Sequence, residues 1–138
     1  MLKHNVFCTK ISKVKKATCL VFFAVVASLS ATSVFAVDEK AGAEIYEKAC
    51  AKCHSITKPM KNKKGPSLLG IVGRSSSRIA GYEYSDAMRA ANLTWTSEKL
   101  DSFLINPKEV VPNTKMKFKG MANPDDRANV IEFMLNQQ

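Results

Sequence analysis

The chain has 138 residues, enough for about one ordinary domain, and 21 basic against 12 acidic residues give it a formal net charge of +9. Five of the lysines lie within residues 1–36, which contain no acidic residue, so residues 37–138 carry only +4. That modest charge, without interleaved aromatic residues, argues against a nucleic-acid-binding protein.

Residues 1–36 have the pattern of a secretory signal peptide. A lysine-rich start precedes an uncharged stretch, which is strongly apolar over residues 20–29 and ends in a small-residue cleavage site, Val34-Phe35-Ala36. We expect cleavage after Ala36, export to the bacterial periplasm and a mature domain of residues 37–138. An uncleaved membrane anchor facing the periplasm stays open as an alternative, because about twenty uncharged residues could span a bilayer.

Removal of that segment leaves Cys50, Cys53 and His54 as the only cysteines and the only histidine of the chain. They form C-x-x-C-H, which is the attachment sequence for a c-type haem. Two thiols three residues apart can each form a thioether with one vinyl group of the same porphyrin, and His54 can then reach the iron as its proximal ligand. The pattern predicts one covalently bound haem c. An exported chain with so few cysteines is also unlike a disulfide-stapled scaffold.

Three other uses of the two cysteines have less support. A thioredoxin-like redox pair requires a βαβ surrounding, which the flanking sequence lacks. A non-haem metal module built on zinc requires four ligands, and the motif supplies three. A disulfide between cysteines so close would close a very short loop and stabilise little.

The apolar periodicity of residues 38–138 predicts an all-α fold with long loops, because no strand-like alternation occurs. The first helix is expected from Glu39 to about Cys53, so that the haem motif closes it. One face of this helix would hold Gly42, Tyr46, Ala49, Cys50 and Cys53. Residues 55–81, rich in lysine, proline, glycine and serine, are expected to be loop.

Three further helices are expected towards the C-terminus. Ser85 and Thr96 can each cap a helix, the first a short one that stops near Asn92 and the second one that ends before Pro107. The last helix has the clearest start, because Asn123 can cap it and a proline and two aspartates follow. Its apolar side comprises Val130, Ile131, Phe133 and Met134.

The ligand on the second face of the iron decides between an electron carrier and a catalyst or gas binder. Methionine is the leading candidate because no second histidine remains. Met60 is disfavoured because it follows the motif too closely. Met88 and Met134 are disfavoured because they belong to helical apolar faces. Met116 lies in a helix-free stretch, residues 111–118, from which a loop can present sulfur from the opposite side. Met116 is therefore the predicted ligand, with Met121 next.

The chain resembles a class I, single-haem cytochrome c of the bacterial c2 and mitochondrial-like branch over essentially all of residues 38–138. The order and spacing of several blocks carry the resemblance. Besides the motif, these are Gly65-Pro66-Ser67-Leu68, Gly73-Arg74, Gly81-Tyr82-Glu83-Tyr84-Ser85-Asp86-Ala87, Leu93-Thr94-Trp95, Asn106-Pro107-Lys108 and Pro112-Asn113-Thr114-Lys115-Met116.

The resemblance implies a small cytochrome c fold of about four or five helices around one haem, with the N- and C-terminal helices crossing. It also implies that the Pro66 carbonyl accepts a hydrogen bond from the distal ring nitrogen of His54. It places Arg74, Tyr84 and Trp95 around the haem propionates. It also implies that Thr114 helps to order the Met116 loop. The chain departs from the family pattern where Met88 replaces a common asparagine and Asn113 the usual glycine, the latter tolerable because asparagine accepts positive φ.

By this resemblance the chain would be a monomeric one-electron carrier and not an enzyme, because two axial ligands leave no open coordination site. Its partners would be membrane-bound and soluble redox proteins of a respiratory or photosynthetic chain. Their acidic patches would meet lysines around the exposed haem edge, expected at Lys52, Lys63, Lys64, Lys108, Lys115, Lys117 and Lys119. A haem enzyme or sensor with a labile sixth ligand stays open as the alternative.

Overall fold

The computed structural model describes residues 37–138, and the predicted signal peptide, residues 1–36, lies outside the described residues. The helices are α1 (Glu39–Ala49), α2 (Asp86–Ala91), α3 (Ser97–Ile105), α4 (Pro107–Val110) and α5 (Pro124–Leu135). In this part of the chain the only strand-like pairing is an isolated bridge between Ser75 and Thr94. The predicted all-α fold with long loops is confirmed.

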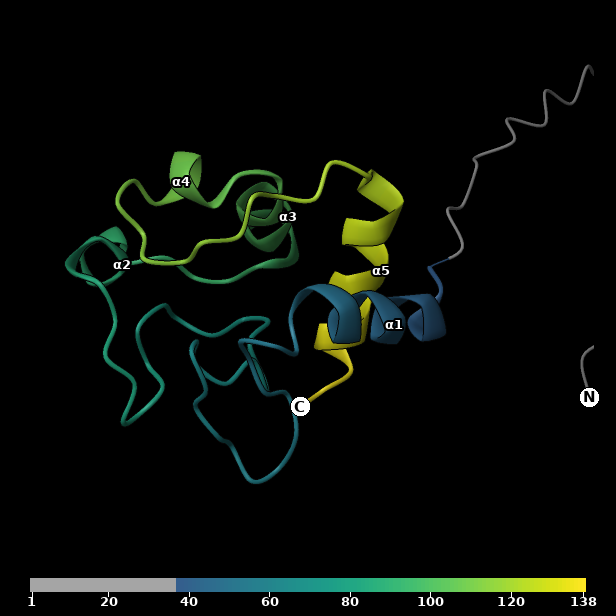
Figure 1. The fold of residues 1–138 in the computed structure, drawn as a ribbon, viewed down its shortest axis with the longest axis horizontal. Helices are drawn as coiled ribbons and strands as arrows, with labels where there is room; N and C mark the ends of the chain where they lie inside the picture. The colour runs from purple at the N-terminus through teal and green to yellow at the C-terminus, as the bar shows by residue number, and fades with distance from the viewer. Residues whose placement is uncertain (1–36) are drawn as a thin grey trace, which may run out of the picture. The chain divides into compact units, whose positions relative to one another are not determined.

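Helices α1 and α5 cross each other, as Figure 1 shows. The crossing is close because Gly42 of α1 has no side chain: a Cβ there would overlap the Asn129 carbonyl oxygen and lie 2.8 Å from the Cβ of Phe133. One turn further along α1, the buried ring of Tyr46 packs on Phe133 with 5.5 Å between ring centroids. The predicted contact between the terminal helices is confirmed.

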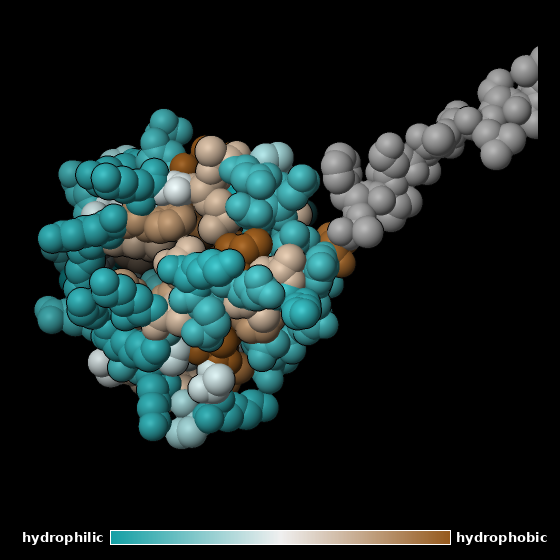
Figure 2. Space-filling view, turned by 45° about the vertical axis from the view of Figure 1, so that its right-hand side comes forward, coloured by the Kyte–Doolittle hydropathy of each residue, from teal (hydrophilic) through white to brown (hydrophobic). Residues whose placement is uncertain are grey.

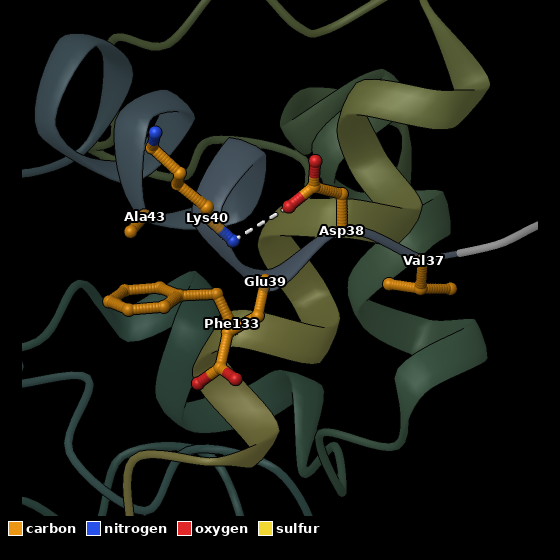
Figure 3. A pocket seen from close by; sticks show the side chains of 6 residues that line it. All are labelled: Val37, Asp38, Glu39, Lys40, Ala43 and Phe133. Atoms are coloured by element: carbon orange, nitrogen blue, oxygen red, sulfur yellow. Dashed lines mark hydrogen bonds between the residues drawn. The ribbon is translucent and has the colours of Figure 1, made fainter.

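The start of α1 is fixed by Asp38. Its side chain caps the helix by accepting from the backbone N–H of Lys40 at 2.9 Å (Figure 3) and from that of Ala41 at 3.1 Å. Its own N–H donates to Asn129 Oδ1 on α5 at 2.9 Å. The cap therefore sets both the first residue of α1 and its position against α5. A surface hollow of about 770 Å³ lies here, and Phe133 forms part of its wall.

The end of α1 differs from the prediction, which extended it to Cys53. The helix ends at Ala49, because the N–H groups of both Cys50 and Ala51 donate to the Tyr46 carbonyl and the next residues turn. Ala49 is also exposed instead of lying on the buried face. Periodicity alone missed this turn, since Cys50 and Cys53 both keep the helical spacing of the buried residues Gly42 and Tyr46.

The caps predicted for the later helices are confirmed. The side chains of Ser85, Thr96 and Asn123 accept from backbone N–H groups in the first turns of α2, α3 and α5. Helix α4 was not predicted, because Pro107 indicated the end of a helix. Pro107 in fact stands at the first position of α4, and the Asn106 side chain accepts from the Lys108 N–H at 3.2 Å.

Helices α1, α3 and α5 build one side of the core, and loop residues complete it. The members with the least exposure are Tyr46, Val111, Val130 and Met134. Trp95, from a loop, packs edge-on against Phe103 of α3 with 4.9 Å between ring centroids. Among the described residues no helix is both long and apolar enough to cross a membrane.

Arg127 on α5 is a buried cation that the sequence did not single out. It is 8 % exposed, and its Nε donates to Asp101 of α3 at 2.6 Å. Its Nη1 donates to the carbonyls of Met121 and Ala122 at 2.9 and 2.8 Å, and the Met121 N–H donates to the Leu104 carbonyl at 2.8 Å. These bonds hold the chain that follows the Met116 segment onto α3 and α5.

Candidate haem-binding site

The two cysteines lie in the turn that follows α1. Both are free thiols, Cys50 buried and Cys53 half-buried. Burial, with a smaller effect of Cys53, raises the pKa of the Cys50 thiol to about 11, so it is neutral at pH 7. The N–H groups of Cys53 and His54 both donate to the Cys50 carbonyl, at 3.0 and 2.9 Å, which holds the three residues in one compact turn. Two thiols and an imidazole are thus presented together.

The His54 ring is oriented by its Nδ1, which lies 2.8 Å from the Pro66 carbonyl oxygen. A carbonyl can only accept, so Nδ1 carries the proton and Nε2 keeps a free lone pair for a metal. Burial, helped by the nearby Lys63 charge, lowers the pKa of His54, while the bond to Pro66 acts in the opposite direction. The ring is therefore neutral at pH 7, which is the form that binds metals. The hydrogen bond implied by the resemblance is present.

Two further residues fix His54, and the sequence analysis did not assign either of them to the ring. The Tyr46 hydroxyl donates to the His54 carbonyl at 3.1 Å, which ties the motif to α1. Gly65 lies against the imidazole: a Cβ there would be 2.6 Å from Nδ1 and 2.8 Å from Nε2. The signal in the sequence was that Gly65 directly precedes Pro66 and begins one of the blocks that carry the resemblance.

Met116 belongs to the wall of a hollow of about 600 Å³, within the range of roughly 300–1,000 Å³ typical of ligand sites. The other lining residues are Asn106, Lys108, Thr114, Lys115, Lys117, Phe118 and Lys119. Met116 and Phe118 are half-buried against the core, while the alternating lysines are exposed. On the face seen in Figure 2, hydrophilic side chains surround a recess with an apolar floor. Cys50, Cys53 and His54 do not line this hollow, so it describes only the surroundings of Met116.

The remaining methionines are placed less suitably for a ligand. Met60 is 53 % exposed, and Met134 is buried in the core at 2 %. Met88 and Met121 pack half-buried at the edge of the core, and neither lines the hollow. The Thr114 hydroxyl accepts a weak hydrogen bond from the Met116 N–H at 3.4 Å. This contact agrees with the role in ordering the Met116 loop that the resemblance implied for Thr114.

Arg74, Trp95 and Tyr84 lie in loops that are bonded together. The Trp95 N–H donates to the Arg74 carbonyl at 2.9 Å, and the Tyr84 hydroxyl accepts from the N–H of Ile79 at 3.3 Å. The Arg74 guanidinium donates to the carbonyls of Leu69 and Ser67, at 2.5 and 2.9 Å. Its burial lowers its pKa, and nearby Tyr84 opposes that shift. Among the described residues Arg74 makes no ion pair with a carboxylate, so this half-buried cation lacks a counter-charge.

Two of the lysines expected at the haem edge are tied to the protein. Lys63 Nζ donates to the Ala51 carbonyl at 2.7 Å. Lys115 Nζ donates to the Glu83 carbonyl and lies 5.4 Å from the ring centroid of Tyr82. Lys115 therefore also connects the Met116 segment to the loop before α2.

The residues present fit a covalent haem. Two free thiols stand beside a neutral histidine whose Nε2 is available, and the thioether of Met116 lines a hollow together with Phe118 and exposed lysines. A donor-rich cluster without an acidic partner suits the two carboxylates of a haem. Within residues 37–138 no group of three or more His, Cys, Asp or Glu side chains could hold a bare metal ion.

Comparison with known proteins finds relatives that are cytochromes c. The pattern of the family described as Cytochrome c matches residues 39–138. The chain is 40 % identical over 97 residues to a cytochrome c of Cannabis sativa, covering 70 % of this chain and 87 % of that protein. The same figures hold for a cytochrome c of Arabidopsis thaliana. A cytochrome c-type cyt cy of Rhodobacter capsulatus is 45 % identical over 97 residues, which are 70 % of this chain and 48 % of that protein.

Proposed function

Because the chain belongs to the cytochrome c family and is an electron carrier with one haem c attached through Cys50 and Cys53, we propose that His54 and Met116 are the axial ligands of its iron. The bound haem supplies an iron that cycles between Fe(II) and Fe(III). With both axial positions filled by protein, the chain exchanges single electrons and does not turn over a substrate.

The observation that carries this proposal is the 2.8 Å bond from His54 Nδ1 to the Pro66 carbonyl. It fixes the tautomer in which Nε2 is the free nitrogen, and it makes the imidazole a stronger donor to a metal. Gly65 keeps the ring in place from one side. On the other side of the proposed site, the thioether of Met116 favours Fe(II), and the half-buried apolar surround disfavours added positive charge. Both effects raise the reduction potential and suit a fairly oxidising part of a respiratory or photosynthetic chain.

The polar end of the site supports an orientation for the bound haem. Arg74, Tyr84 and Trp95 offer N–H and O–H donors from one connected set of loops, and Arg74 lacks an acidic partner among the described residues. Haem carboxylates placed there would supply the counter-charge. The thioether edge of the porphyrin would then lie towards Cys50 and Cys53.

Partners and location are part of the same proposal. Exposed lysines around the Met116 recess favour brief docking of acidic surfaces on membrane-bound and soluble redox proteins, with the carrier acting as a monomer. The basic, then apolar, then small-residue pattern of residues 1–36 favours export to the periplasm. N-terminal sequencing of the periplasmic protein is expected to begin at Val37, and a start at Met1 would support the retained anchor.

The ligand assignment is tested by Met116→Ala in the haem-loaded protein. The parent is expected to show a low-spin ferric spectrum with the weak far-red methionine-to-iron band. The variant should lose that band and bind added imidazole or carbon monoxide readily, and its reduction potential should fall.

The runner-up methionine provides a matched control. Met121→Ala also removes a half-buried thioether near the same segment, yet it should keep the far-red band. Survival of the band in Met116→Ala together with its loss in Met121→Ala would reverse the assignment. A high-spin ferric spectrum of the parent would instead indicate an open site, as in a haem enzyme or sensor.

A further inference from the structure

Ser77 combines two unfavourable features that nothing within the described residues offsets. Its φ is +59°, in the left-handed region that costs an ordinary side chain on the order of 1 kcal/mol. Its hydroxyl oxygen is fully buried and has no hydrogen-bond partner among the described residues, and leaving such a group unpaired costs on the order of 1–3 kcal/mol. It is the one buried side-chain polar atom in residues 37–138 in this condition. A buried hydroxyl of this kind needs an explanation.

Bonds of the residues on either side tie the loop that carries Ser77 to the donor cluster described above. On the N-terminal side, Gly73 and Arg74 are bonded to Trp95, and Ser76 exchanges bonds with the loop before Trp95. On the C-terminal side, the Ile79 N–H donates to the Tyr84 hydroxyl at 3.3 Å. In the chain, Ser77 therefore lies between Arg74, which is bonded to Trp95, and Ile79, which is bonded to Tyr84.

Every side chain of this cluster can donate, and no acidic side chain from the described residues pairs with it. Arg74 uses two amino groups on carbonyls and keeps its positive charge uncompensated. The Tyr84 hydroxyl oxygen already accepts from Ile79, so its own hydrogen is left to donate. A carboxylate, which only accepts, satisfies such a set best.

We propose that the Ser77 hydroxyl donates a hydrogen bond to a carboxylate of the bound haem, beside Arg74, Tyr84 and Trp95. This bond would satisfy the buried hydroxyl and retain a serine where backbone conformation favours glycine. The inference rests on the proposed position of the haem carboxylates at this cluster. It adds a binding residue that the sequence analysis had read only as part of an irregular loop.

The test compares Ser77→Gly and Ser77→Ala in the haem-loaded protein. Resonance Raman spectroscopy of the haem propionate bending band reports hydrogen bonding to the carboxylates, and spectroelectrochemistry gives the reduction potential. Both variants lack the hydroxyl, so both should shift the band by the same amount. Both should also lower the potential, because a less neutralised carboxylate favours Fe(III). A purely conformational role predicts that Ser77→Gly leaves both measurements at parental values, and that result would overturn the inference.

Two controls separate this inference from the proposed orientation of the haem. Ser76→Ala removes a neighbouring buried hydroxyl that already accepts from the Leu93 N–H at 3.0 Å, so it should lower stability and leave the band unchanged. Tyr84→Phe removes another proposed donor and should shift the band. A shift in Tyr84→Phe without one in Ser77→Gly would refute only the role of Ser77. No shift in either would refute the carboxylate position itself.

Discussion

The His54 ring is oriented by the Pro66 carbonyl and by Gly65, and the space at Gly65 is the more easily disturbed of the two. A Cβ at position 65 would lie 2.6 Å from Nδ1, closer than two unbonded heavy atoms of these kinds can approach. Gly65→Ala should therefore displace the imidazole and break its bond to the Pro66 carbonyl, at a cost of about 1–3 kcal/mol in the free energy of unfolding. Chemical denaturation of the haem-loaded protein measures that cost. The ferric absorption spectrum should also change, because the displaced histidine would bind the iron differently.

Pro66→Ala is the matched control for this residue. It keeps the backbone carbonyl that accepts from His54 Nδ1 and removes only the proline ring. We expect its ferric spectrum to stay close to that of the parent. A larger spectral change in Pro66→Ala than in Gly65→Ala would show that loop rigidity, and not contact with the ring, sets the histidine.

At the residue scale, the sequence predicted what depends on short-range chemistry. Asn113 was expected to accept a left-handed backbone, and its φ is +63°. Arg127 could not be recognised as buried, because its partner Asp101 is 26 positions away and the two meet only after α3 and α5 pack. Gly65 and Ser77 were missed for the same reason: their meaning lies in what surrounds them in space.

At the scale of elements, helix starts were predictable and helix ends less so. Ser85, Thr96 and Asn123 form their capping bonds within three residues of sequence, so local pattern decides them. The end of α1 depends on the Tyr46 carbonyl accepting from two successive N–H groups, which periodicity does not reveal. Helix α4 was missed because a proline that ends one helix can also begin the next.

The crossing of α1 and α5 depends on the missing side chain of Gly42. Replacing glycine by alanine inside a helix is intrinsically favourable by about 1 kcal/mol. Gly42→Ala should nevertheless destabilise the protein by about 1–3 kcal/mol or more, because the new Cβ would overlap the Asn129 carbonyl of α5. Thermal unfolding followed by far-ultraviolet circular dichroism measures the net effect. An unchanged or higher melting temperature would mean that the two helices separate without cost.

For the domain of residues 37–138 taken as a whole, helices give the frame and loops give the site. The terminal helices were predictable from amphipathic pattern, whereas the loop residues at the haem site owe their positions to single hydrogen bonds. His54 bonds to Pro66 twelve residues away, and Lys115 bonds to Glu83 thirty-two residues away. The bond between His54 and Pro66 was expected only from the resemblance to a family, because no local sequence pattern encodes contacts between residues so far apart in the chain.

Charge acts at the same scale, and the lysines around the Met116 recess are not equivalent. Lys115 is held by the Glu83 carbonyl and the Tyr82 ring, whereas Lys117 is exposed and makes no ion pair with a described residue. Lys117→Glu should therefore weaken attraction of anions to the recess without loosening the Met116 segment. Oxidation of the reduced protein by hexacyanoferrate(III), an anion, should slow by up to about tenfold at low salt, the lower end of the range for electrostatic steering.

Lys40→Glu changes the net charge equally but lies at the separate hollow beside α1, so it should slow the same reaction much less. Raising the ionic strength should slow the parent and shrink the difference between the variants, because salt screens exposed charges beyond roughly 10 Å. Tris(phenanthroline)cobalt(III), a cation, should show the opposite salt dependence. Equal slowing by the two substitutions would mean that only net charge matters, and that the lysines at the Met116 recess do not direct the partner to the haem edge.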